Sequence, residues 1–368
     1  MQLENQKSKM KIKLKDAIEF ANWVFEKNKV PSKYSSVCAD VLLSADELGF
    51  KSHGLSRLGY YIKRIKDGVI DVSATPEIVR DNKACVTIDG HNALGQIVGK
   101  YAMNQAIAKT HEHGISCVAV KNSSHYGIAS YYSRYATQHN LVGMSFTNAR
   151  PAVAPYGGVE PKMGTNPYAI AFPSDEKYPF SIDCATSVYQ RGDLEVMARK
   201  TPDNYVPNCA IVSENENLTF ERSLRWLKQG IAALTPVGGH KGSGLSIAIE
   251  LMCSAFQSGA YMSKLSGLYE GDTKNPNYDI GHFFICIDPE NFADLNDFKK
   301  NVGDVMREIK SSKHIKGEEI LVPGEIEYNT SIDVHKNGIE ISDVLLEELN
   351  NLGFNKWQTK NLTINDSK

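Results

Sequence analysis

The stretch that decides the fold class is ISCVAVKNSSHYGIASYYSRYATQHNLVGMSF, residues Ile115–Phe146. Ile115–Val120 is an apolar run typical of a buried strand, and Ile128–Gln138 has the spacing of a helix. Leu141–Phe146 is a second apolar run. Strand, loop, helix and strand in this order are typical of α/β layer structures.

The polar loop KNSSHYG joins the first of these strands to the helix. Loops at that end of a strand carry active-site groups in many α/β proteins. His125 in this loop is a candidate acid–base residue, because a histidine gives or takes a proton near neutral pH. The alternative is that His125 or a neighbouring serine only caps the next helix.

A second group of candidates lies in KSHGLSRLGYY, residues 51–61. Leucine and isoleucine spacing predicts a helix over Leu55–Asp67, on which residues four apart share a face. An arginine fork, a histidine and the unpaired N–H groups of a helix start can together hold a small carboxylate and move a proton. The candidates are Ser52, His53, Arg57 and Tyr61. In the alternative interpretation Ser52 caps the helix, and His53 and Arg57 are ordinary solvated residues.

The glycine-rich segment PVGGHKGSG, residues 236–244, precedes a long apolar helical pattern over Leu245–Phe256. Such a backbone lets an anion approach closely, and Lys241 supplies a positive charge. The spacing fits neither a Walker loop nor the dinucleotide fingerprint of a Rossmann fold. We expect a phosphate or carboxylate here, with a plain glycine turn as the alternative. In the segment DCATS, residues 183–187, Asp183 could orient a ribose or a histidine. Equally, Thr186 or Ser187 could simply cap the helix that follows.

Composition limits the classes of function. The 368 residues carry 41 basic and 43 acidic side chains, which argues against a general affinity for nucleic acid or an anionic membrane. The seven cysteines include no Cys-x-x-Cys pair, so we expect neither a disulfide framework nor a zinc site, and no spacing demands another metal. The first twenty residues lack the apolar region of a signal peptide, and no apolar run is long enough to span a membrane. We therefore expect a cytoplasmic protein.

Helical patterns occupy both ends of the chain, and the strand-rich part lies between them, from about Val69 to Ile287. The simplest arrangement is a helical domain built from both termini, with an α/β domain inserted between its two parts. We place the helical domain at residues 1–75 and 297–368, and the inserted domain at residues 76–296.

Six motifs together resemble one family in their order and spacing. They are KSHGLSRLGYY, NSSHYG, TNARPAVAPYGGVEPKMGTNPYAIAFPS, DCATS, PVGGHKGSGLSIAIELM and LVPGE. The chain is similar, over about Leu14–Phe354, to the malate/L-lactate dehydrogenase family that lacks a Rossmann fold. That family includes ureidoglycolate dehydrogenase, sulfolactate dehydrogenase, 2,3-diketogulonate reductase and piperideine-2-carboxylate reductase.

The resemblance implies a non-Rossmann, mixed-sheet NAD(P)-binding domain of the α/β (α+β) class, inserted into a helical domain that makes the dimer contacts of a homodimer. It implies hydride transfer between NAD or NADP and a small 2-hydroxy or 2-keto acid. His125 or His53 would be the acid–base group, and Ser52, Arg57 and Tyr61 would bind the substrate. The residues implied at the cofactor are Asn148, Asp183, Cys184, Ala185, His240, Lys241, Gly324 and Glu325. We expect His53, His125 and Lys241 to meet in one cleft.

The sequence also departs from the family pattern. Asp193 stands where many members have lysine, Cys209 where tryptophan is common, and Ser213–Arg222 differs from the usual motif. These departures leave the substrate and the choice between NAD and NADP open. The alternatives are a cyclic imino acid reductase, because the same arginine and histidine could handle an imine, and a nucleotide-binding homologue without turnover.

Overall fold

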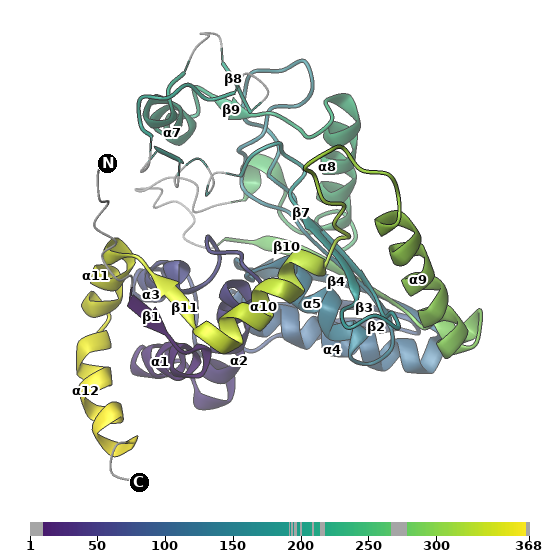
Figure 1. Ribbon diagram of the computed structural model, residues 1–368, viewed down its shortest axis with the longest axis horizontal. Helices are drawn as coiled ribbons and strands as arrows, with labels where there is room; N and C mark the ends of the chain where they lie inside the picture. Colours follow the sequence, from purple (N-terminus) through teal and green to yellow (C-terminus); the bar gives the residue numbers. More distant parts are fainter. Residues whose placement is uncertain are drawn as a thin grey trace. The chain divides into compact units, whose positions relative to one another are not determined.

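The chain forms two compact units, shown in the computed structural model of Figure 1. The structure describes residues 10–190, 192, 194, 197–198, 201–207, 210–213, 218–265 and 278–365. The terminal unit comprises Met1–Gly68 and Glu325–Lys368, and the central unit comprises Val69–Gly324. Residues 69–75 and 297–324, which the sequence analysis grouped with the termini, belong to the central unit. Asp193 and Cys209 lie outside the described residues.

The central unit is built on a seven-stranded sheet with the order β2-β3-β4-β10-β5-β6-β7. The strands are β2 (Glu77–Asn82), β3 (Cys85–Asp89), β4 (Ile115–Ser123), β5 (Val142–Thr147), β6 (Tyr168–Phe172), β7 (Phe180–Cys184) and β10 (Ile280–Ile287). β3 and β4 run parallel, and the other neighbours pair antiparallel. This mixed sheet confirms the predicted α/β class and the absence of the all-parallel Rossmann arrangement.

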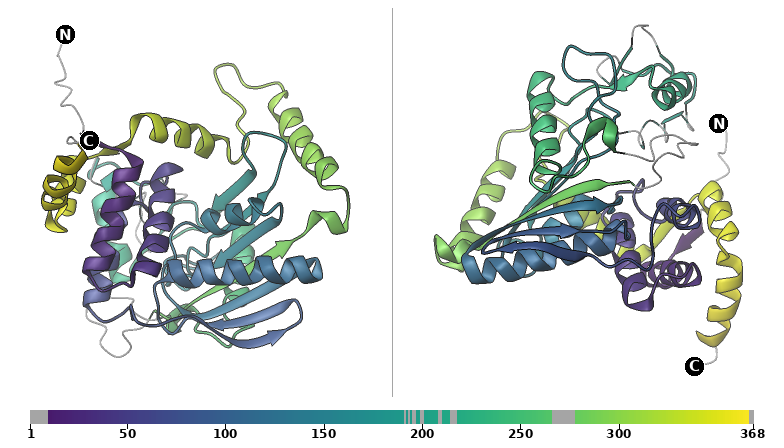
Figure 2. Two further views of the ribbon diagram at one scale, coloured as in Figure 1. Left: turned by 90° about the horizontal axis from the view of Figure 1, so that it is seen from below. Right: turned by 180° about the vertical axis from the view of Figure 1, so that it is seen from behind.

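Helices cover both faces of this sheet (Figure 2). α4 (Gly95–His113) and α5 (Ala129–Thr137) pack on one face, and α8 (His240–Met252) packs on the other. Successive side chains of a strand point to opposite faces, so Ala119 of β4 and Phe283 of β10 meet Ile249 of α8 in one buried cluster. α9 (Leu295–Lys310) is amphipathic, and the carboxylate of the preceding residue, Asp294, caps its first turn.

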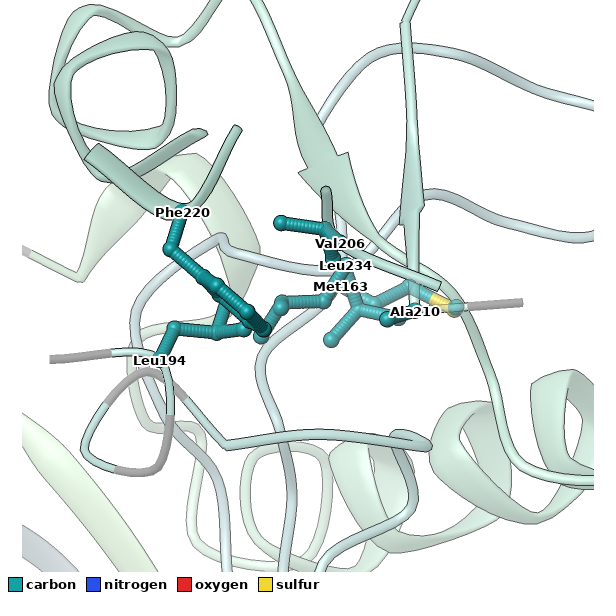
Figure 3. Close-up of a cluster of buried hydrophobic side chains, with 7 residues drawn as sticks. Met163, Leu194, Val206, Ala210, Phe220 and Leu234 are labelled. Atoms are coloured by element: carbon teal, nitrogen blue, oxygen red, sulfur yellow. The ribbon is translucent and has the colours of Figure 1, made fainter. Parts of the chain in front are cut away.

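A smaller apolar cluster supports the chain that leads into the glycine-rich turn (Figure 3). It is formed by Val153, Met163, Leu194, Val206, Ala210, Phe220 and Leu234. The elements around it are β8 (Ile211–Val212), β9 (Ala233–Leu234) and α7 (Phe220–Gln229), which ends at Gly230 in the left-handed conformation. Because β9 ends two residues before PVGGHKGSG, this cluster fixes where that turn begins.

The terminal unit is mainly helical (Figure 1). It contains α1 (Leu14–Lys27), α2 (Ser32–Glu47), a 3-10 turn (Leu55–Arg57), α3 (Leu58–Lys66), α10 (Glu325–Asn337), α11 (Asp343–Asn351) and α12 (Phe354–Asn365). The strands β1 (Met10–Ile12) and β11 (Ile339–Ile341) pair antiparallel and join the two ends of the chain. Phe20 of α1 contacts the rings of Phe354 and Trp357 at centroid distances of 5.0 and 5.6 Å. The C-terminal helices therefore complete the core that the N-terminal helices begin.

Candidate functional site

One end of the central sheet gathers several of the predicted residues. Ser123 at the end of β4 pairs with Ile280 at the start of β10, and Thr147 at the end of β5 pairs with His282. Tyr168 at the start of β6 pairs with Cys184 at the end of β7. His125, Asn148 and Asp183–Ala185 therefore follow or end strands at the same side of the sheet.

The loop that carries half-buried His125 is held at both ends. The Ser124 hydroxyl accepts a hydrogen bond from the N–H of Gly95 at 2.8 Å and donates one to the carbonyl of Ala93 at 3.1 Å. The N–H of Ser130, in the first turn of α5, donates to Asp183 Oδ2 at 2.8 Å. One oxygen of Asp183 thus caps the helix that follows His125, a role that neither prediction for Asp183 contained.

The DCATS segment lies beside the glycine-rich turn. The N–H of Val237 donates to the carbonyl of Thr186 at 2.9 Å, and the N–H of Val188 donates to the carbonyl of Thr235 at 2.9 Å. Thr186 in turn donates both its N–H and its hydroxyl to the carbonyl of Thr165, each at 2.9 Å. These bonds bring Asp183–Ala185 and the turn that carries Lys241 into one neighbourhood.

The start of α8 combines open backbone N–H groups with a positively charged side chain. α8 begins at His240, five residues before the predicted start, so His240 and Lys241 lie exposed in its first turn. Gly239 has φ 64° and caps the helix without a side-chain bond, and a Cβ on Gly238 would meet no atom within 4 Å. The unpaired N–H groups, the helix dipole and the lysine match the charge of a diphosphate, so the donor set fits the cofactor that the family implies.

Asn148 is fixed from three sides. Its Oδ1 accepts the N–H of Gly281 at 2.9 Å, and its amide nitrogen donates to Glu250 Oε1 and to the carbonyl of Ala260, each at 3.2 Å. Asn166 donates to Glu250 Oε2 at 2.9 Å, and its own Oδ1 accepts the N–H of Ala149 at 3.0 Å. Because Asn148 is only 1% exposed, its side chain here serves the loop geometry, and its contact with a cofactor stays a prediction.

A cavity of about 700 Å³ adjoins this arrangement in the central unit. It is lined by Met163, Ile247, Glu250, Leu251, Ser254, Ala255, Ser258, Gly259, Ala260, Tyr261, Met262 and Lys264. Most of these side chains are apolar, and the Glu250 carboxylate is already engaged by three N–H donors.

In the terminal unit, Ser52, His53 and Arg57 are linked. Ser52 Oγ lies 2.9 Å from His53 Nδ1, and Arg57 Nε donates to the carbonyl of Ser52 at 2.8 Å. Burial, and secondarily the charge of Arg57, lower the pKa of His53 to about 4. The imidazole of His53 is therefore neutral at pH 7 when no ligand is bound. A neutral imidazole suits a general base or a hydrogen-bonding group better than a general acid.

The helix prediction for this stretch began too early. Residues Leu55–Arg57 form a 3-10 turn, and α3 begins only at Leu58. The Arg57 guanidinium lies 5.6 Å from the centroid of the Tyr60 ring, whereas Tyr61 is fully buried. Tyr60, which the sequence analysis did not single out, is thus the aromatic neighbour of Arg57, and a substrate contact of Tyr61 stays a prediction.

Asp46 was also missed and organises this stretch from α2. Its Oδ2 accepts the N–H of Leu55 at 2.6 Å, and it is only 8% exposed. Burial raises the pKa of Asp46 to about 7, against smaller opposing effects of the Leu55 N–H and the charge of Lys51. A Cβ on Gly54 would lie 2.1 Å from Asp46 Oδ2, so the glycine of KSHG is required by this contact.

The last predicted pair stands where the two units meet in sequence. Gly324 ends the central unit with φ 100°, and its Cβ position lies 2.6 Å from the carbonyl of Pro179, next to the start of β7. Glu325 begins α10 in the terminal unit and is 8% exposed. His53 and Arg57 belong to the terminal unit, and His125 and Lys241 to the central unit, so their meeting in one cleft stays a prediction.

Two features are absent from the described part of the chain. No helix there is both long and apolar enough to cross a membrane. No group of three or more histidine, cysteine or acidic residues among the described positions could hold a metal ion.

Comparison with known proteins identifies the family. The family model for malate/L-lactate dehydrogenase matches residues 12–350. L-sulfolactate dehydrogenase of Methanocaldococcus jannaschii is 39% identical over 339 residues, which cover 90% of this chain and 94% of that protein. Malate dehydrogenase of Pyrococcus horikoshii is 39% identical over 337 residues, covering 89% and 91%.

A solved structure agrees over nearly the whole chain. The crystal structure of malate dehydrogenase from Entamoeba histolytica has a TM-score of 0.90 at 34% identity, covering 94% of this chain and 97% of that one. The resemblance inferred from the six motifs is thereby confirmed. The chain belongs to the malate/L-lactate dehydrogenase family and is an oxidoreductase that acts on the CH–OH group of its donor.

Proposed function

We propose that this protein transfers a hydride between NAD or NADP and C2 of a small 2-hydroxy or 2-keto acid. The observation that carries the proposal is the juxtaposition of DCATS with the open start of α8, where the Val237 N–H donates to the Thr186 carbonyl at 2.9 Å. This pairing places the exposed Lys241 and unpaired N–H groups beside the end of β7, which suits a dinucleotide rather than an isolated phosphate.

The substrate carboxylate is assigned to Arg57. Its Nε is engaged by the Ser52 carbonyl and its guanidinium lies over the Tyr60 ring, so the fork is oriented before a ligand arrives. Such preorganisation favours a planar, bidentate partner such as a carboxylate. Both 39%-identical relatives are named for acids with a second anionic group, and we extend this property to the substrate of the present chain.

The proton is assigned to His125. When bound, the nicotinamide supplies or accepts the hydride. In the direction of reduction the oxygen on C2 gains a proton, and half-buried His125 stands on a loop anchored at Ser124 and Ser130. His53, with its lowered pKa, is neutral at pH 7 and is assigned to hydrogen bonding with the substrate, oriented by Ser52.

A panel assay tests the reaction itself. Purified protein is mixed with NADH or NADPH and, in turn, with oxaloacetate, sulfopyruvate, pyruvate and a cyclic imino acid, and the loss of cofactor absorbance is followed. We expect turnover with a keto acid, fastest for those with a second anionic group. Turnover of the imine alone would identify an imino acid reductase, and cofactor binding without turnover of any compound would identify a non-catalytic homologue.

Two substitutions separate the two halves of the assignment. Arg57→Ala should weaken the binding of the keto acid by about 1.5–3 kcal/mol and should have little effect on the binding of the cofactor. Lys241→Ala should do the reverse, and exposed Lys316→Ala serves as the control for loss of a positive charge. If Arg57→Ala weakens the binding of the keto acid and the binding of the cofactor equally, Arg57 does not bind the substrate.

A further inference from the structure

His282 is a fully buried histidine that the proposed reaction leaves without a role. It lies on β10, between β4 and β5, and is 0% exposed. Its Nε2 is 2.8 Å from Ser123 Oγ at the end of β4, and its Nδ1 is 2.8 Å from Thr147 Oγ1 at the end of β5. Each partner lies one or two residues before a proposed site residue, Ser123 before His125 and Thr147 before Asn148.

The aromatic neighbour of His282 strengthens this connection. The ring of Tyr126, the residue after His125, stacks on the imidazole with a centroid distance of 4.3 Å and an interplanar angle of 3°. Tyr126 is itself held by Ser145 through its hydroxyl at 3.0 Å, and its carbonyl accepts the hydroxyl of Tyr132 at 2.6 Å. His282 therefore touches the chain on both sides of His125.

The chemistry of the partners specifies a neutral ring. A neutral imidazole has one donor and one acceptor nitrogen, and a hydroxyl can pair with either. The two hydroxyl partners therefore satisfy both nitrogens without charge. In addition, burial lowers the pKa of His282 to about 3, so the ring does not exchange protons near neutral pH.

We propose that His282 is a positioning residue that aligns two arms of the site, the His125 loop through Ser123 and Tyr126, and the Asn148 loop through Thr147. This inference rests on the proposed function, in which His125 handles the proton, and on the predicted contact of Asn148 with the cofactor. The two hydrogen bonds of one ring have separate consequences: the Ser123 bond governs proton transfer, and the Thr147 bond governs cofactor affinity.

Two substitutions of His282 separate the arms. The polar atoms of a glutamine side chain are as many covalent bonds from Cβ as the histidine Nε2 atom, so a glutamine can retain the Ser123 hydrogen bond. The polar atoms of an asparagine match the position of Nδ1, so an asparagine can retain the Thr147 hydrogen bond. We expect His282→Asn to lower kcat roughly 10- to 100-fold, as a small misplacement of an acid–base group does, with cofactor affinity within about twofold of wild type. His282→Gln should keep more of kcat and lose cofactor affinity instead.

Smaller substitutions keep the test independent of folding defects. Ser123→Ala should reproduce the loss of kcat, and its matched control is Ser116→Ala, which removes another buried hydroxyl at the opposite end of β4. The titration of His125, followed by NMR with histidine-selective labelling and assigned by His125→Asn, should shift in Ser123→Ala and not in Ser116→Ala. This titration does not require turnover.

The outcomes distinguish this inference from the proposed function. If wild type turns over none of the panel, the proposed function fails, and the His125 titration and the cofactor affinities still decide the role of His282. If wild type is active but Ser123→Ala and Ser116→Ala behave alike in kcat and in the titration, His282 does not position His125. Identical kcat and affinity in His282→Asn and His282→Gln would also overturn the proposal.

Discussion

Glu250→Gln is the substitution for which the structure gives the most detailed expectation. The carboxylate is 4% exposed and accepts three N–H groups: Asn148 at 3.2 Å and Met262 at 3.1 Å on Oε1, and Asn166 at 2.9 Å on Oε2. Both asparagines are held in this orientation, because their own oxygens accept backbone N–H groups. All three partners are donors, so only a group with two acceptor oxygens satisfies them.

A glutamine replaces one of these oxygens with an NH₂ group. With its oxygen toward Asn148 and Met262, its NH₂ faces the NH₂ of Asn166, so one bond is lost and two donors are left opposed. Leaving a buried donor unsatisfied costs about 1–3 kcal/mol, and the remaining two bonds lose their charge assistance. We therefore expect a loss of about 2–4 kcal/mol in the free energy of unfolding, reduced where water from the adjoining cavity reaches the pair.

The assay is urea unfolding followed by circular dichroism, together with NADH and NADPH affinity by fluorescence. Exposed Glu290→Gln is the control for loss of a negative charge. Glu250→Gln should lower the unfolding midpoint and weaken cofactor binding, because the bond to Asn148 loses its charge assistance and Asn166, which holds the N–H of Ala149, loses its partner. A midpoint and an affinity both equal to those of the control would refute the account of Glu250 as the group that orients the Asn148 loop.

Three further changes are expected to act locally. Gly54→Ala should destabilise the protein by about 2–4 kcal/mol because its Cβ would lie 2.1 Å from Asp46 Oδ2, whereas Gly59→Ala, with open space around it, should be neutral or stabilising; equal urea midpoints would contradict this. Asp46→Asn should remove a loss of stability between about pH 4 and pH 7, at most about 4 kcal/mol, because the folded wild type holds its proton to higher pH than the unfolded chain. His53→Gln should act in the opposite sense: the lowered pKa of His53 makes wild type lose stability as pH falls from about 6.5 to 4, so this variant should lose less, and unfolding across that pH range measures both effects.

Local patterns predicted the helices and strands whose ends carry clear signals. The sequence predicts a helix over Gly95–His113 that ends at Gly114, and these are the observed bounds of α4. Gly114 adopts the left-handed conformation with φ 81° that ends the helix. The prediction placed the start of α8 too late, because the first residues of this helix include Gly242 and Gly244, and glycine has a low helix propensity. Contacts fix this turn instead: a Cβ on Gly242 would lie 1.8 Å from the carbonyl of Val237.

Two residues that the sequence analysis missed, Glu250 and His282, act between distant parts of the chain. Asn148 and Glu250 are 102 positions apart, and His282 is 135 and 159 positions from its two hydroxyl partners. No short-range pattern marks such a residue, because its role arises only when strands far apart in sequence become neighbours. Glu250 did interrupt an otherwise apolar run, and a charge in that position was the one available signal.

Motifs located the candidate site residues, and the roles of these residues in binding stay predictions. The glycines of PVGGHKGSG and the arginine of KSHGLSR were identified because both motifs need particular residue types at fixed spacing. The predicted helix start at Leu55 was wrong, since Leu55–Arg57 form a 3-10 turn and α3 begins only at Leu58. The Arg57 guanidinium lies 5.6 Å from the centroid of the Tyr60 ring, and a substrate contact of Tyr61 stays a prediction.

The most direct test of the central claim follows the hydride itself. Wild type and His125→Asn are incubated with a 2-keto acid and with reduced cofactor deuterated on one or the other face of nicotinamide C4, and the product is analysed by mass spectrometry. We predict that wild type transfers deuterium to C2 of the hydroxy acid from only one of the two faces of the nicotinamide. We also predict that His125→Asn forms this product far more slowly. A hydroxy acid that contains no deuterium from either deuterated cofactor would contradict the account.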